Sequence, residues 1–241
     1  MRGALYTADG PAAVRAVSDQ SISETPQYAG DAALLGLAQW VEGSAAIAER
    51  CAAVLRDRGG DGDSDLADEL EAALGRQPIS LLASVPVDLD ELSGQLEGDP
   101  EFTGGRIDLR TGEVYPDSYF DDPAAWRDSG DDEEEGEEEE GEDEKTDSDR
   151  WLWIDSHGSR AGYQDMVEFR DTVHDQRLAA MLDVALDGRG AFRRFKGVLD
   201  DVPAELDRWH RLEDDRRRGR ARSWLAGQGY RAAVPREPRH P

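Results

Sequence analysis

The sequence predicts an α+β protein, with a small antiparallel β-sheet (a hairpin plus one strand) packed by C-terminal helices and preceded by an all-α N-terminal region. Three observations support this class. Apolar residues recur at helical spacing through residues 11–75. Residues 104–118 alternate apolar and polar side chains before a turn, and residues 151–156 are rich in aromatic and β-branched residues. Helical spacing then returns from about residue 163. Strands and helices are therefore segregated, which is typical of an α+β domain.

Residues 1–78 are expected to form the helical region. Apolar positions predict helices that start at Gly30-Asp31, at Ser44 and near Ser64, and Gly75 ends the last of them. Prolines mark residues 79–86 as a linker, after which 87–232 forms the α+β domain. A helix over 88–96 opens this domain with Asp88 as its N-cap. The chain therefore divides into two folding units.

The β-sheet is predicted from the segments on either side of an acidic insert. Ile107 and Leu109 alternate with Asp108, and Gly112 supplies the positive φ of the turn that leads to Val114. The segment WLWIDS, residues 151–156, is expected to pair with this hairpin as a third strand.

The rest of the domain is predicted to be helical. Apolar residues at i, i+3, i+4, i+7 and i+8 form one stripe from Leu178 through Met181 to Leu186, and Gly188 ends that helix. Pro203 fits the first turn of a later helix. The aromatic residues of these helices are expected to be core anchors because their spacing matches buried faces; they are Phe192, Phe195, Trp209 and Trp224. Residues 233–241 are predicted to be a disordered tail.

Charge is distributed unevenly along the chain. The net charge is −26, and residues 128–149 contain 15 acidic residues but only one basic residue. Such a block repels itself and has no apolar surface to bury, so it is predicted to be a disordered insert. No apolar run is long enough for a membrane span, and no apolar run precedes Asp9, so we expect a cytoplasmic protein without a signal peptide.

Metal and cofactor chemistry is not indicated. Cys51 is the only cysteine, and none of the four histidines lies three or four residues from another histidine. Asp155, Ser156 and His157 are consecutive, whereas a catalytic triad brings its members together from separate elements. We therefore predict no catalytic residue, no metal and no cofactor.

The string GRGAFRRFK, residues 188–196, is the most distinctive motif. At 100° per residue, Arg193 points away from the apolar stripe, and Lys196 and Arg189 fall near the same side. These three cations are the candidate anion- or partner-binding surface, whereas Arg194 lies at the buried edge and is expected to pair with a carboxylate. The alternative is a solvated helix face in which Lys196 pairs with Asp200.

A second basic cluster, RRRGRAR, spans residues 216–222. Such runs often bind nucleic acid through phosphates. The net charge of −26 opposes that function, and Glu213, Asp214 and Asp215 precede the run as local partners.

Several of these strings together resemble a known family. GRIDLRTGEVYP, WIDSHGSRAGYQDMVEFRDTV and GRGAFRRFKGVLDDVP, followed by WHRLED and WLAGQGY, occur in one order over about residues 87–230. In this respect the chain resembles the uncharacterised protein family 0158 of bacteria. The resemblance implies a compact bacterial cytoplasmic domain and assigns no activity and no catalytic residue.

The sequence thus favours a non-enzymatic protein that binds another protein. Two alternatives stay open at this point: a nucleic-acid-associated regulator that uses the basic C-terminal helices, and a nucleotide or phosphate binder at the start of the GRGAFRRFK helix, where free backbone N–H groups attract anions.

Overall fold

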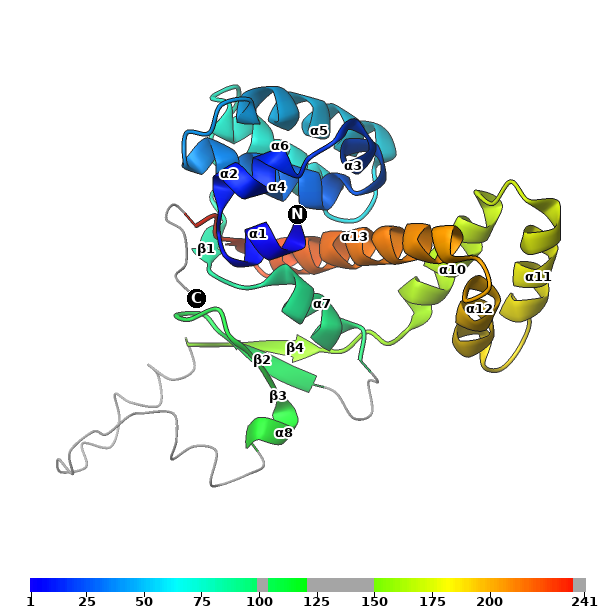
Figure 1. Cartoon of the computed structure of the whole chain (residues 1–241). Coiled ribbons are helices and arrows are strands. Elements are labelled where there is room, and N and C mark those ends of the chain that lie inside the picture. Colours follow the sequence, from blue (N-terminus) through cyan, green and yellow to red (C-terminus); the bar gives the residue numbers. More distant parts are fainter. Residues whose placement is uncertain (99–103, 121–149, 236–241) are drawn as a thin grey trace.

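The computed structural model describes residues 1–98, 104–120 and 150–235 (Figure 1). The predicted α+β class is confirmed, because helices at both ends of the chain accompany a three-stranded antiparallel sheet. The acidic insert, residues 128–149, and the end of the predicted tail, residues 236–241, lie outside the described residues.

The N-terminal region is a bundle of helices built around small side chains. Its helices are α1 (Arg2–Tyr6), α2 (Gly10–Arg15), α3 (Asp19–Glu24), α4 (Pro26–Ala38), α5 (Ser44–Arg58) and α6 (Asp63–Ala73). Alanines at the centre, such as Ala33 and Ala48, are fully buried and allow close helix approach. Gly30 serves the same purpose, because a Cβ there would lie 2.7 Å from a methyl carbon of Leu66.

Helix α4 begins earlier than predicted. Gly30-Asp31 was expected to cap it, but the helix starts at Pro26, which occupies its first position. The reason lies elsewhere in the chain: the Asp215 carboxylate accepts hydrogen bonds from the Gln27 and Tyr28 backbone N–H groups at 2.9 and 3.3 Å. A distant side chain therefore satisfies the free N–H groups at the helix start.

The predicted antiparallel sheet has the order β3-β2-β4 and consists of β2 (Gly104–Asp108), β3 (Val114–Pro116) and β4 (Trp151–Asp155). Ile107 lies opposite Val114 on one side and Leu152 on the other. Gly112 has φ +78°, and a Cβ there would lie 2.2 Å from the Pro86 carbonyl oxygen, so the turn requires glycine for two reasons. The short helix α8 (Asp117–Phe120) follows β3.

A second pairing was not predicted. β1 (Ala83–Val85), inside the expected linker 79–86, runs parallel to β5 (Tyr230–Ala232). Ala233, the first residue of the expected tail, donates its N–H to the Val85 carbonyl at 2.7 Å. The linker and the start of the tail are therefore joined by backbone hydrogen bonds. These strands have three residues each, too short for alternation to reveal them.

Helices α10 (Arg160–Asp171), α11 (Gln176–Leu186) and α12 (Ala191–Leu199) form a lobe at one end of the molecule (Figure 1). Its core contains Phe169, Phe195 and Trp209, all fully buried, and Phe192 is partly buried against them. The fourth predicted anchor, Trp224, packs instead on the core beneath the sheet, together with α7 (Leu89–Leu96).

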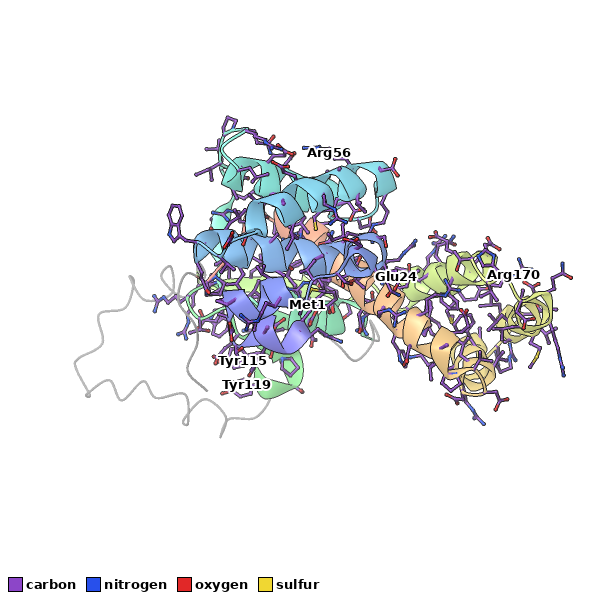
Figure 2. The ribbon with its side chains drawn as sticks, turned by 45° about the horizontal axis from the view of Figure 1, so that its top comes forward. Met1, Glu24, Arg56, Tyr115, Tyr119 and Arg170 are labelled. Carbon is purple, nitrogen blue, oxygen red and sulfur yellow. The ribbon has the colours of Figure 1, made fainter. Side chains whose placement is uncertain are left out.

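Helix α13 (Pro203–Gly227) crosses the whole molecule and contacts each of these regions (Figure 1). Its Trp209 belongs to the lobe core, whereas Ala221 and Leu225 belong to the core beneath the sheet. Figure 2 shows Glu24 of α3 beside α13, where its carboxylate accepts from Arg211 Nε at 3.0 Å. The predicted division into two folding units at residues 79–86 stays a prediction, with α13 packed against both.

Candidate functional site

The GRGAFRRFK segment forms the loop and helix that expose the predicted cations. Gly188 and Gly190 have φ +77° and +75°, which turn the chain sharply between α11 and α12. Ala191, Phe195 and Leu199 are the buried face of α12. This amphipathic pattern leaves the basic side chains of the segment on the outside of the lobe.

The three predicted binding cations differ in their contacts. Arg189, in the loop, and Arg193, on α12, are exposed and have no ion-pair or hydrogen-bond partner for their side chains among the described residues. Lys196 is exposed as well but faces α13, where its Nζ lies 3.7 Å from a Glu213 carboxylate oxygen. Its partner is therefore Glu213 and not Asp200, and Lys196 is directed away from Arg194 by the helix phase.

Arg194 has a different partner from the one predicted. Its Nε donates to the Ala185 carbonyl at 3.2 Å, and its Nη2 donates to the Asp187 carbonyl. We expected a buried carboxylate, but Arg194 is exposed and binds carbonyls at the C-terminal end of α11, where a cation is favoured by the helix dipole and by unsatisfied C=O groups. Its structural role stays a prediction.

Beside Arg194, α11 and α12 enclose an open apolar groove of about 580 Å³. Met181 is 42% exposed and Val184 is 75% exposed, and Arg177 and Arg194 line the groove. Met181 shares the predicted apolar stripe of α11 with Leu178, Leu182 and Leu186, but those three are buried in the lobe core whereas Met181 is exposed.

Sequence reasoning missed this groove. The signal was present as apolar residues outside the main stripe of α11, namely Ala180 and Val184. The apolar stripe of a helix is sometimes wider than its contact with the protein core requires. The additional apolar residues then often mark a second contact face.

The basic run at residues 216–222 is engaged within the protein. Gly219 allows α13 to approach the loop before α6, because a Cβ there would lie 2.3 Å from the Asp61 carbonyl oxygen. Every arginine of the run pairs with carboxylates from other elements: Arg216 with Asp165 and Glu168, Arg217 with Glu97, Arg218 with Asp31 and Asp90, Arg220 with Glu97 and Asp165, and Arg222 with Asp31 and Glu69.

The innermost pairs join α13 to the N-terminal helices. Arg222 is 2% exposed; its Nη2 donates to Asp31 at 2.6 Å and its Nε donates to Gln27 Oε1 at 2.9 Å. Arg218 Nε donates to the other Asp31 oxygen at 2.6 Å. Burial disfavours the Asp31 carboxylate, but the charges of Arg222 and Arg218 outweigh it and lower the pKa of Asp31.

A second buried cluster lies around Arg58. Its guanidinium donates to Asp63 through Nε and Nη2, at 2.7 and 2.6 Å, and to Asp215 through Nη1 at 2.6 Å. Burial raises the pKa of Asp215 to about 6, against the opposing effect of Arg58. The pKa of Asp63 is lowered, because its hydrogen bonds and charge interaction with Arg58 outweigh burial.

These opposite shifts predict a stability maximum at roughly pH 4, with a decline on either side. An unfolded Asp titrates near about pH 3.9. Asp31 and Asp63 have lowered folded pKa values, so their stabilisation is lost as the pH falls below that value. Asp215 has a raised folded pKa, so its contribution is present at low pH and is lost as the pH rises through about 6. Melting temperatures at constant ionic strength measure this profile.

The matched variant for this profile is Asp215→Asn, which keeps an oxygen for the α4 N–H groups. It should remove the decline in melting temperature between roughly pH 4 and pH 6 that Asp215 produces in the parent protein. A parent melting temperature that rises steadily from pH 4 to pH 8 would contradict the assignment.

The Asp155-Ser156-His157 segment is attached to the end of α7. Ser156 Oγ donates to the Gln95 carbonyl and the His157 N–H donates to the Leu96 carbonyl, both at 2.7 Å.

Burial raises the pKa of the Cys51 thiol to about 12. Within residues 1–98, 104–120 and 150–235, no group of three or more His, Cys, Asp or Glu side chains is arranged to hold a metal ion. None of the described helices is both long and apolar enough to cross a bilayer.

The fold and the surface together define a helix-rich α+β protein whose C-terminal lobe carries an exposed apolar groove beside arginines. Residues 127–238 match the model of the uncharacterised protein family UPF0158, which confirms the predicted resemblance. The match begins after the hairpin, later than the predicted start near residue 87. The part of the matched segment that the structure describes contains β4, the lobe, α13 and β5. No curated protein and no solved structure gives a significant match to the chain.

Proposed function

We propose that this chain is a non-enzymatic protein-binding module whose partner docks on the groove between α11 and α12. The observation that carries the proposal is the exposure of Met181 and Val184, at 42% and 75%, in a groove of about 580 Å³. Apolar side chains gathered in one exposed groove commonly mark an interaction site.

The surrounding charge selects an acidic partner. Arg177 and Arg194 line the groove, and Arg193, which precedes Arg194 on α12, is exposed. Arg177, Arg189 and Arg193 have no ion-pair partner in the described part of the chain, although the protein carries a net charge of −26. Complementary charges speed association and exclude wrong partners, while apolar contacts supply affinity. The partner is therefore a segment with apolar side chains flanked by Asp or Glu.

The nucleic-acid alternative receives less support. Its cations were the arginines of residues 216–222, and each of these is paired with a carboxylate of the protein. Phosphates would have to displace those carboxylates from an overall acidic molecule, at a large electrostatic cost. The phosphate-ligand alternative has Arg189 beside the start of α12, but the groove next to it is lined mainly by apolar side chains.

Selection from a displayed peptide library tests the proposal. We expect enriched peptides to combine Asp or Glu with large apolar residues. In the full chain, Val184→Glu and Arg193→Glu should each weaken binding of the enriched peptide about tenfold or more. Val184→Glu places a charge in the apolar groove, and Arg193→Glu reverses a charge that is complementary to the acidic peptide. Both are surface changes that should leave the melting temperature nearly unchanged.

Two matched controls keep the test specific. Leu81→Glu makes the same kind of change at a fully exposed apolar residue outside the groove, and Arg15→Glu reverses an exposed arginine on α2. Both should bind the peptide like the parent. Enrichment of basic peptides, or normal binding by Val184→Glu, would overturn the proposal. Binding of RNA or DNA with a steep salt dependence would favour the alternative.

A further inference from the structure

A cavity of about 460 Å³ lies where α1, α4, α6 and α7 meet α13 and the end of the described chain. Its wall contains apolar residues, among them Leu5, Leu35 and Val87. It also contains charged residues, among them Asp31, Glu69 and Arg222. Its size falls within the range of small-ligand sites, which are typically apolar with a few polar groups for orientation.

The arginines in this wall are already occupied. Arg2 pairs with Asp90 and Asp214, Arg218 pairs with Asp31 and Asp90, and Arg222 pairs with Asp31 and Glu69. The carboxylates of the wall outnumber these guanidinium groups; they are Asp31, Glu69, Asp88, Asp90 and Glu91. Among the described lining residues, the excess charge is therefore negative, and no guanidinium is left over for an anion.

Glu69 forms an ion pair with Arg222 but no hydrogen bond. Its side chain is 10% exposed, and its oxygens accept no hydrogen bond from the described residues. Its nearest cation, Arg222 Nη1, lies 3.7 Å away, beyond hydrogen-bond distance. Burial outweighs the attraction of Arg222 and raises the pKa of Glu69. A ligand N–H group would give the Glu69 carboxylate the hydrogen bond that Arg222 does not supply.

We propose that this cavity binds a small organic cation, with its ammonium group on Glu69 and its apolar body against Leu5, Leu35 and Val87. An ammonium group supplies both the missing donor and the opposite charge. The proposal is independent of the groove on α11 and α12, because the two sites share no residue.

Calorimetric titration of the full chain with three matched probes tests the charge preference. The probes are phenethylamine, the neutral phenethyl alcohol and the anionic 3-phenylpropionate, which share one ring and differ in the head group. We expect saturable binding of the amine, with the alcohol weaker by about tenfold or more and no binding of the acid. Binding of the acid as tight as that of the amine, or no binding of the amine, would overturn the proposal.

The variant Glu69→Gln tests the assigned contact. It keeps the shape of the side chain and removes its charge, so it should weaken amine binding about tenfold or more. Glu71→Gln is the control, because Glu71 lies on the same helix outside the cavity and pairs with Arg76 at 3.7 Å. Equal affinity of Glu69→Gln and the parent would refute the site.

A measurement on the unaltered protein covers the case in which Glu69→Gln fails to fold. Nuclear Overhauser effects should connect the phenethylamine ring protons with the methyl groups of Leu5 or Leu35. Effects to methyl groups elsewhere, with none to these two residues, would place the amine outside the cavity and reject the proposal.

Discussion

Replacing Arg222 with methionine is expected to lower the free energy of unfolding by about 3–5 kcal/mol. The guanidinium is 2% exposed and donates to Asp31 and Gln27. Methionine keeps much of the volume but leaves the Asp31 carboxylate with Arg218 alone in a buried site. Removing one partner of a buried ion pair is costly because the remaining charge stays desolvated. Denaturant unfolding followed by circular dichroism measures the change.

Arg211→Met is the matched control for this variant. Arg211 lies on the same helix and pairs with Glu24 at 3.0 Å, but both side chains are partly exposed to solvent. Surface ion pairs contribute about 0–1 kcal/mol, so this change should be small. If the two variants lose the same stability, the buried network does not fasten α13 to the N-terminal helices.

Phe195→Ala is expected to cost about 3–5 kcal/mol in the free energy of unfolding. Phe195 is fully buried, and its ring centroid lies 6.0 Å from that of Phe169 and 5.0 Å from that of Trp209, in edge-to-face arrangements. Alanine removes the transfer energy of the ring and opens a cavity at the centre of the lobe. Thermal and denaturant unfolding report the loss.

The control for the lobe is Val184→Ala, which removes apolar atoms from an exposed position on α11. Its effect should stay within about 0.5 kcal/mol. A loss below about 1 kcal/mol for Phe195→Ala would mean that the lobe collapses around the smaller side chain, since the cost of such cavities depends on how far the neighbours relax.

Local patterns were sufficient for the predicted fold class and for most elements. The alternation at Ile107 and Leu109 with Gly112 predicted the hairpin, and the spacing of Leu178, Leu182 and Leu186 predicted the buried face of α11. These signals depend only on neighbours within a few residues, so they can be read without the tertiary structure.

The features that were missed depend on contacts between distant segments. The early start of α4 depends on Asp215, which is 188 residues from Gln27. The ion pairs of Arg218 and Arg222 select Asp31 from 54 acidic residues, and no spacing rule identifies that choice. The groove was missed because Met181 fits the apolar stripe of α11 in the sequence. In the structure its side chain is exposed and not covered by the lobe core.

The placement of α13 at the end of the chain has a consequence for synthesis on the ribosome. Asp31 is translated 191 residues before its partner Arg222. At about 5–20 residues per second, the N-terminal helices wait roughly 10–40 s for that arginine. During this interval Asp31 has no partner from α13, so its charge favours a hydrated arrangement of the nascent helices. The final burial of this region is therefore a late event that follows the emergence of the C-terminal helix.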